Sequence, residues 1–305
     1  MRKACLEQVY QLAKKDKRVV FMGSDLGAGT LSHFQEEMPE RFFMEGIAEA
    51  HTVGMACGMA HEGKVVYVNT IQSFLTRRCY EQLLLDACMH NLNVRFIGNG
   101  GGLVYAPLGP THWATEDLSI LRTIPNLTVL APADAEEMNR LMPQTLDHKG
   151  PIFIRLAKGY DPIVTKETSF EIGKAYPYSE GRDVLLIGCG VMLGTMKQAE
   201  KLLAESGIEA SLLHLPTIKP LDSETIISRA RKTRAIITLE ENTILGGLGS
   251  AVAEILAEAC LPNPLRMKRI GLPDSFSENY GSQLEHFAHN GLTAENIVKE
   301  AQKLF

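Results

Sequence analysis

The sequence predicts an α/β protein with two consecutive parallel-sheet domains, and three observations indicate this fold. Short hydrophobic runs alternate with helical patterns along most of the chain, and their β-branched character is typical of strands covered on both faces. The alternation stops at 161–182, which is rich in glycine, proline and polar residues, and then resumes. A chain of 305 residues is long enough for two separate cores. We therefore expect domains at residues 1–160 and 183–305, joined by a linker at 161–182.

Hydrophobic runs in the first half predict five strands, at 19–24, 65–69, 94–99, 127–132 and 152–156. The helical patterns between them lie at 2–15, 47–62, 74–90 and 134–147. The second half continues the scheme, with strands at 183–190, 209–216, 235–242 and 265–271 and helices near 192–206, 222–231, 247–260 and 293–304.

The composition argues against several classes of protein. A hydrophobic content of 45% and a charged content of 22% are typical of a globular chain. A net charge of −5 without a basic tract argues against binding nucleic acid. The 6 cysteines form no C-x-x-C pair and lie near no histidine at zinc spacing, so we expect no metal site in this chain and a reducing compartment. No run is long enough to cross a membrane and no signal peptide is evident, so we expect a cytoplasmic protein.

Two glycine-rich segments raise the question of a phosphate-binding loop. GNGGGL at 98–103 and GGLGS at 246–250 match neither the P-loop pattern nor the dinucleotide-binding fingerprint. For GGLGS we expect a close approach of a helix start to a neighbouring element. An anion site at that helix start is the less favoured alternative.

The stretch GIAEA at 46–50 places the carboxylate of Glu49 before a helical pattern that is suited to burial. An ionised carboxylate in such surroundings is costly, so Glu49 either takes part in chemistry or has a partner. Phe74 and His112 also follow predicted strands, and ligands of open parallel sheets bind at the carboxyl ends of strands. We therefore expect Glu49, Phe74 and His112 to converge on one crevice. From the residues alone, Phe74 also fits a core position, His112 a local turn contact, and Glu116 and Asp117 first-turn acids of a helix.

Motifs in a fixed order carry a resemblance to a known family. RFFMEGIAEAHTVGMACGMA, QSFLTRRCYEQ and GPTHWATEDLSILRTIPNLTVLAPADAEE resemble the pyrimidine-binding domain of transketolase. TLEENTILGGLGSAVAEILAE resembles the C-terminal domain of that family, so the resemblance covers essentially the whole chain. 1-Deoxyxylulose-5-phosphate synthase and the beta subunits of 2-oxoacid dehydrogenases are relatives in the same thiamine diphosphate superfamily.

The resemblance implies roles for several of these residues. Glu49 would bind N1′ of the aminopyrimidine of thiamine diphosphate and favour the tautomer whose nitrogen removes the thiazolium C2 proton, a task that suits a semi-buried carboxylate with a raised pKa. Phe74 would stack on the aminopyrimidine ring, and Arg77 would line it. His112 would face the substrate oxygens and stabilise negative charge there.

Further positions follow from the same resemblance. Gly46 and Asp25 are expected to contact the cofactor, and Arg2 and Lys158 to contact the substrate. Where transketolase has an aspartate and two cationic phosphate-binding residues, this chain has Leu108, Gly100 and Ala131. Losing cations from a phosphate pocket weakens a phosphorylated substrate unless others, such as Lys158 or Arg155, replace them. We therefore expect a modified, nucleotide-linked, sulfonated or branched sugar.

The chain has no G-D-G motif, which in this superfamily binds the diphosphate through Mg²⁺. The resemblance thus implies one subunit of a split transketolase, paired with an N-terminal subunit that binds the diphosphate and Mg²⁺ in an α2β2 heterotetramer. The expected reaction is transfer of a two-carbon ketol unit between sugars. A decarboxylating reaction on pyruvate or another 2-oxoacid is the alternative within the superfamily, and a non-catalytic binding protein is the alternative outside it.

Overall fold

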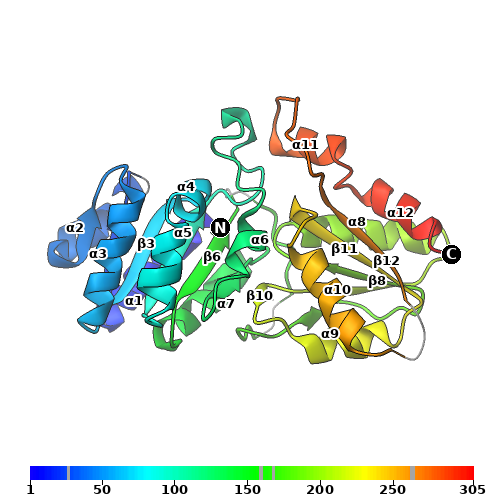
Figure 1. The fold of residues 1–305 in the computed structure, drawn as a ribbon, viewed down its shortest axis with the longest axis horizontal. Coiled ribbons are helices and arrows are strands. Elements are labelled where there is room, and N and C mark those ends of the chain that lie inside the picture. Colours follow the sequence, from blue (N-terminus) through cyan, green and yellow to red (C-terminus); the bar gives the residue numbers. More distant parts are fainter. Residues whose placement is uncertain (26–27, 158–160, 167–168, 262–264) are drawn as a thin grey trace.

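The computed structural model describes residues 1–25, 28–157, 161–166, 169–261 and 265–305. Two α/β units lie beside each other, the first coloured blue to green and the second mainly yellow to red (Figure 1). Each unit has its own sheet, and both sheets are mainly parallel. The predicted fold class is therefore confirmed.

The first sheet has seven strands in the order β10-β5-β6-β4-β3-β1-β2. Their bounds are Val19–Gly23 (β1), Phe42–Met44 (β2), Val65–Ile71 (β3), Val94–Asn99 (β4), Thr128–Leu130 (β5), Ile152–Leu156 (β6) and Thr217–Lys219 (β10). All neighbouring strands are parallel except β10, which runs antiparallel to β5. Since β10 comes from far along the chain, the second half of the sequence supplies an edge strand of the first sheet.

Helices cover both faces of the first sheet, because successive strand residues point to opposite sides. Val19 and Phe21 of β1 pack with α1 and α7, whereas Val20 and Met22 pack with α3 and α4. The bounds of these helices and their shorter neighbours are Arg2–Lys15 (α1), Ser32–Glu37 (α2), Glu49–His61 (α3), Gln72–Arg77 (α4), Tyr80–Gln82 (α5), Asp117–Leu121 (α6) and Ala135–Asp147 (α7).

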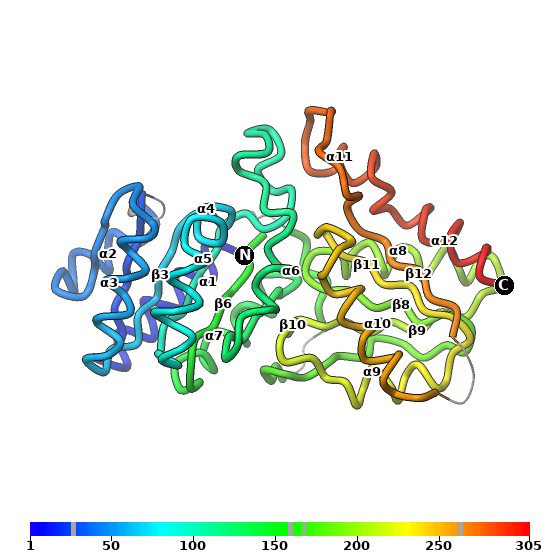
Figure 2. The backbone as a smooth tube through the Cα atoms, viewed as in Figure 1, coloured from blue at the N-terminus to red at the C-terminus, as the bar shows by residue number. Residues whose placement is uncertain are grey.

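The second sheet has the order β12-β11-β8-β9-β7, with only β7 antiparallel to its neighbour. Its strands are Tyr176–Pro177 (β7), Val184–Gly188 (β8), Ala210–His214 (β9), Ala235–Thr243 (β11) and Arg266–Leu272 (β12). The helices are Met192–Glu205 (α8), Ser223–Ala230 (α9), Leu248–Glu258 (α10), Gln283–His289 (α11) and Ala294–Gln302 (α12). In the backbone tube, the segment before α6 and the segment that leads into α11 both project from the same side of the molecule (Figure 2).

The long predicted elements are present with bounds that differ by a few residues, but the predicted helix at 74–90 is wrong in detail. It begins earlier, as α4, is interrupted after Arg77, and ends in a π-helical segment, Leu83–Cys88. The backbone N–H of Met89 bonds to the carbonyl of Leu84, five residues earlier, at 3.0 Å, which gives the wider turn.

The close approach expected for GGLGS is confirmed. The amides of Leu248 and Gly249 at the start of α10 donate to the two carboxylate oxygens of Glu240 at 2.7 and 2.9 Å. A Cβ on Gly247 would lie 2.1 Å from Glu240 Oε2, so a larger residue there would displace this carboxylate. The helix start is thus occupied by a carboxylate of the chain itself.

Among the helices of the described residues, none combines the length and the apolar character that a membrane span requires.

Candidate functional site

The candidate site lies at the carboxyl edge of the first sheet, where the chain leaves β1, β2 and β3. Glu49 is the first residue of α3, and Phe74 is the third residue of α4, which follows β3 directly. The turn before Glu49 is fixed to the end of β1, because Gly46 N donates to Ser24 O at 3.2 Å. Gly46 has a φ of +71°, in the left-handed region that favours glycine. Local backbone geometry therefore places the carboxylate of Glu49 at this edge.

The carboxylate of Glu49 is buried, with 4% of the side chain exposed, and has a protein partner. Arg78 Nη1 donates to Glu49 Oε2 at 3.1 Å, and the Arg78 side chain is 50% exposed. The residues next to Glu49 in the sequence do not reveal this partner, because Arg78 lies 29 residues further along the chain. Among the described residues no hydrogen bond to Glu49 Oε1 is found, so that oxygen remains available as an acceptor.

Arg78 connects Glu49 to an aromatic cluster. Its guanidinium carbon lies 3.8 Å from the centre of the Phe74 ring, a cation–π arrangement. The ring of His112 lies 5.0 Å from that of Phe74 at an angle of 59°, and the ring of Tyr105 lies 6.5 Å from that of His112. Thr111 Oγ1 is 2.9 Å from His112 Nδ1. The structure therefore brings Glu49, Phe74 and His112 to one place, as expected, through a residue that the sequence analysis did not single out.

Arg77 points away from this cluster. It pairs with Glu116 through Nε and through Nη2, the latter at 2.9 Å from Glu116 Oε2, and its Nη1 donates to the carbonyl of Pro110 at 3.0 Å. Burial raises the pKa of Glu116, but the hydrogen bond and charge of Arg77 outweigh this effect and leave that pKa below its usual value. Arg78, the residue that caps the end of α4, is therefore the arginine that lies over the Phe74 ring.

In the described part of the chain, the structure does not place the other residues that were expected to contact cofactor or substrate in direct contact with Glu49 or His112. Asp25 is exposed at the end of β1, where Ser24 Oγ donates to Asp25 Oδ1 at 2.9 Å. Arg2 begins α1, and Ala157 N donates to Met1 Sδ at 3.4 Å, so this helix starts at the carboxyl end of β6. Among the described residues, no hydrogen bond or ion pair joins Arg2 to Glu49 or His112. Lys158 lies outside the described residues.

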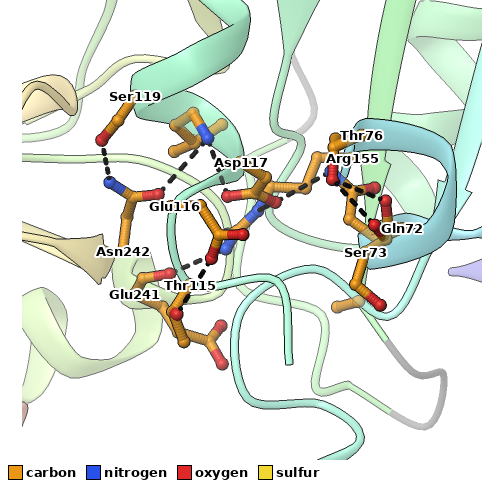
Figure 3. Close-up of polar contacts among 12 residues, drawn as sticks. Gln72, Ser73, Thr76, Thr115, Glu116, Asp117, Ser119, Arg155, Glu241 and Asn242 are labelled. Carbon is orange, nitrogen blue, oxygen red and sulfur yellow. Dashed lines mark hydrogen bonds and ion pairs between the residues drawn. The ribbon is translucent and has the colours of Figure 1, made fainter. Parts of the chain in front are cut away.

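The two acids after His112 are both engaged. Glu116 pairs with Arg77, while Asp117 accepts from its neighbouring amide, Leu118 N, at 2.8 Å, as a first-turn acid does. Asp117 also accepts from Arg155 Nε at 2.7 Å, deep between the two domains (Figure 3). Arg155 is 6% exposed, and this buried pair means that it is not free to replace a missing phosphate-binding cation. A signal was present in the sequence: an arginine inside a hydrophobic strand, IFIRL, needs a buried partner.

A cavity of about 1030 Å³ lies beside the Arg77–Glu116 pair. It is lined by both domains, including Trp113, Phe276, Asn279 and His286. Its size is at the upper end of the range of about 300–1,000 Å³ that small-molecule sites occupy. Within the described residues, no group of three or more His, Cys, Asp or Glu side chains is arranged to hold a metal ion.

The donor set around Glu49 fits an aminopyrimidine ring. The guanidinium of Arg78 is a flat, positively charged N–H donor that bonds to Glu49 and lies over the face of Phe74. An aminopyrimidine with a protonated ring nitrogen is also flat and also donates an N–H. The same carboxylate and the same aromatic face therefore suit both groups.

Fold and site together define an α/β protein with a buried carboxylate, an aromatic face and a histidine at one sheet edge. The family model of the transketolase pyrimidine-binding domain matches residues 1–160, and the model of the transketolase C-terminal domain matches 173–297. The chain belongs to the transketolase family and corresponds to the C-terminal section of a split transketolase.

Individual relatives agree with this assignment. The 6-deoxy-6-sulfo-D-fructose transketolase subunit SqwH of Clostridium sp. (strain MSTE9) is 36% identical over 308 residues, covering 100% of this chain and 94% of that protein. The 1-deoxy-D-xylulose-5-phosphate synthase of Desulforudis audaxviator (strain MP104C) is 40% identical, over 96% of this chain but only 46% of that protein. A solved split-gene transketolase, described as an inactive β4 tetramer, has a TM-score of 0.89 at 33% identity, over 99% of this chain and 97% of that one.

Proposed function

We propose that the chain is one subunit of a two-chain, thiamine diphosphate-dependent transketolase that transfers a two-carbon ketol unit between sugars. The observation that carries the proposal is the arrangement of Glu49, Phe74 and His112 at one sheet edge, bridged by a flat N–H donor. When bound, thiamine diphosphate supplies a carbon nucleophile and an electron sink. The protein supplies binding, orientation and the placement of protons.

Three residues of this chain carry these tasks. Glu49 accepts the hydrogen bond of the protonated ring nitrogen and so fixes the tautomer of the aminopyrimidine. Phe74 provides the face on which that ring lies. His112, held through Nδ1 by Thr111, directs its other ring nitrogen to the substrate oxygens and stabilises negative charge on them. Gly46 and Asp25, at the ends of β2 and β1, border the same site.

The proposed partner is an N-terminal transketolase subunit that binds the diphosphate and Mg²⁺, in a cytoplasmic α2β2 assembly. An open surface beside the site supports a partner. Ile47 is 68% exposed next to Glu49, and a Cβ added to Gly54 or Gly58 of α3 meets no atom within 4 Å. Exposed apolar side chains next to a flat helix face are typical of surfaces that bind another protein.

The proposed substrate is a sugar other than the usual sugar phosphates. Leu108 is exposed and Ala131 is buried, so neither position offers a cation or a carboxylate to the substrate. Arg155 is committed to Asp117. A sulfonated sugar is supported by the Clostridium relative, which is named as a subunit of a 6-deoxy-6-sulfo-D-fructose transketolase. Arg2 and Lys158 stay candidates for contacting an anionic end of the substrate.

A decarboxylating reaction is the second candidate, because a 1-deoxy-D-xylulose-5-phosphate synthase is similar to this chain over 96% of its length. The two reactions differ in what they consume. Ketol transfer consumes a ketose and releases no gas, whereas the second reaction consumes pyruvate and releases CO₂.

The test is reconstitution of the chain with a G-D-G-containing partner, thiamine diphosphate and Mg²⁺, followed by assays with ketose donors and with pyruvate. We expect ketose-dependent transfer, with 6-deoxy-6-sulfo-D-fructose preferred over xylulose 5-phosphate as donor. Comparable turnover of xylulose 5-phosphate and ribose 5-phosphate would contradict the substrate proposal. CO₂ release from pyruvate without ketose consumption would replace the first candidate with the second.

A further inference from the structure

Four residues form a buried series of polar contacts between the two domains, through three side chains and both the backbone carbonyl and the side chain of Glu241. They are Gln72 at the start of α4, Asp117 in α6, Arg155 in β6 and Glu241 in β11 (Figure 3). Asp117, Arg155 and Glu241 are 0%, 6% and 2% exposed. None of the four belongs to the cluster that is proposed to bind cofactor or substrate, so their arrangement needs a separate explanation.

Glu241 bonds to the base of the loop that carries His112, where the two ends of the loop meet. Gly102 and Ala114 exchange two backbone hydrogen bonds, of 3.0 and 2.9 Å, which close residues 103–113 into a loop. Leu103 N, the first amide of this loop, donates to Glu241 Oε1 at 2.7 Å. Gln283 Nε2 of α11 donates to the same oxygen at 2.7 Å. A carboxylate from the second domain therefore holds the base of a loop of the first domain.

The glycine run before this loop fits closely against the charged side chains. A Cβ on Gly102, whose φ is +64°, would lie 2.3 Å from Glu241 Cδ. A Cβ on Gly101 would lie 2.5 Å from Arg155 Cγ. The segment that raised the question of a phosphate-binding loop thus serves a close approach of backbone to Glu241 and Arg155.

A second arm of the network reaches α4. Arg155 Nη2 donates to the backbone carbonyl of Glu241 at 2.7 Å, and Arg155 Nε donates to Asp117 Oδ2 at 2.7 Å. Gln72 Nε2 donates to the same oxygen of Asp117 at 2.8 Å. Gln72 is the first residue of α4, two residues before Phe74. The two segments that carry Phe74 and His112 are therefore attached to one buried network.

A contribution to stability does not by itself explain why Asp117, Arg155 and Glu241 are buried between the domains. Replacing a buried ion pair with well-packed hydrophobic residues is often neutral or stabilising, so such a pair is a poor way to strengthen a domain junction. A buried hydrogen-bonded network, of which Gln72 Oε1 is a buried atom without a partner among the described residues, instead restricts the geometry of the groups that it contacts. The groups contacted here are the base of the His112 loop and the first turn of α4.

We propose that Glu241 is a positioning residue of the second domain that sets the place of the His112 loop and, through Arg155 and Asp117, of α4. The proposal rests on the proposed function, because it gives the C-terminal domain a role in arranging that site. The neighbouring Glu240 offers a matched control, since it is similarly buried and its hydrogen bonds within the described residues go to the start of α10.

The experiment is backbone hydrogen exchange by mass spectrometry on the full chain, with Glu241→Gln compared with Glu240→Gln. We expect Glu241→Gln to speed exchange about tenfold in 103–116, because the amide group weakens the bonds to Leu103 and Gln283, and to speed it less in 72–78, which Glu241 reaches through its backbone carbonyl and Arg155. Glu240→Gln should speed exchange at 247–252 and leave the other two segments unchanged. Unchanged exchange in 103–116 in the Glu241 variant, or equal effects of both variants there, would overturn the proposal.

Gln283→Ala covers the case in which Glu241→Gln does not fold. It removes one donor to Glu241 from a half-buried position and leaves the carboxylate in place. We expect the same segments to exchange faster, by about two- to threefold. No change in 103–116 in this variant would also contradict the proposal.

Enzyme kinetics distinguish a role of Glu241 in positioning the site from a role in stabilising the fold alone. In the reconstituted enzyme, Glu241→Gln should lower kcat about tenfold while the KM for the ketose changes less than twofold, and Glu240→Gln with a similar loss of Tm should keep its kcat. Equal kcat losses in both variants would make Glu241 merely structural. If wild-type complexes show no ketose transfer, the proposed function fails, whereas the exchange result still decides whether Glu241 holds the loop.

Discussion

Glu49 and Glu241 are buried to almost the same extent but differ in what holds them. Glu49 bonds to one long side chain, Arg78, which is 50% exposed to solvent. Glu241 bonds to a buried backbone amide, Leu103 N, and to the half-buried side chain of Gln283. Glu49, which is proposed to receive a ligand, is thus paired with a side chain that a ligand can displace. Glu241, which is proposed to hold a loop, is bonded in part to the backbone. The predictions below test this difference, from the largest expected effect to the smallest.

Glu49→Gln should have the largest effect. A glutamine cannot hold the proton of the ring nitrogen as a carboxylate does, so we expect turnover of the reconstituted enzyme to fall by about a hundredfold or more. The measurement is kcat under saturating cofactor, with Glu45→Gln as the control, since Glu45 lies four residues earlier, between β2 and α3, and pairs with His51. Unchanged turnover in Glu49→Gln would remove this residue from the mechanism.

Arg78→Ala should increase the affinity for thiamine diphosphate. The cofactor has to displace the guanidinium from Glu49 and from the face of Phe74, and these two contacts together are worth roughly 1–1.5 kcal/mol, or about a tenfold change in Kd. The Kd is measured by calorimetry on the reconstituted complex. Unchanged or weaker binding would show that Arg78 is not an exchangeable partner of Glu49.

The stability of the chain should fall as the pH rises through neutrality. Burial raises the pKa of Glu240 and of Glu241 from 4.5 to about 7. Between the unfolded value near 4.5 and the folded value near 7, the folded state therefore binds more protons than the unfolded state, and stability decreases with rising pH. Tm should decline from about pH 5 to about pH 8, and Glu241→Gln should make this decline shallower. If Tm depends on pH identically in the variant and the wild type, the raised pKa of Glu241 does not contribute to the decline.

Arg77→Ala should have the smallest effect. Arg77 and Glu116 form a partly exposed pair, so we expect a loss of about 1 kcal/mol or less in the free energy of unfolding. Cofactor Kd should change less than twofold, in contrast to Arg78→Ala, because Arg77 bonds to Glu116 and Pro110 rather than to Glu49. Urea denaturation and calorimetry measure the two quantities. A large loss of cofactor affinity would return Arg77 to the ring-lining position that the family resemblance implied.

The parts of the fold that follow from local pattern could be predicted from the sequence. Strands such as VVFMGS and helices such as 2–15 have continuous hydrophobic runs or periodic faces, and the structure contains them. The three-residue strand β10 could not be found, because Thr217–Lys219 carries no pattern of its own and is a strand only through its pairing with β5. Local sequence does not encode such a long-range partner.

The same reason limits the prediction of the site. Glu49, Phe74 and His112 lie within motifs, so their convergence followed from the ends of strands. Arg78 was missed because its role depends on a helix phase that places it, and not Arg77, on the face of Phe74. Glu241 was missed because its partner Leu103 is 138 residues away in the sequence.

The pairing of β10 with β5 has a consequence for how this chain unfolds. β5 has three residues, and without β10 its outer backbone groups form an open sheet edge, which invites pairing with other chains. The contact continues beyond the strands, since Ala131 N donates to Pro216 O at 2.7 Å and Gly190 N donates to Ala131 O at 3.0 Å. A fragment that stops at the linker would lack this cover and would tend to aggregate. The edge of the first sheet therefore stays covered only while the second half of the chain holds β10 in place.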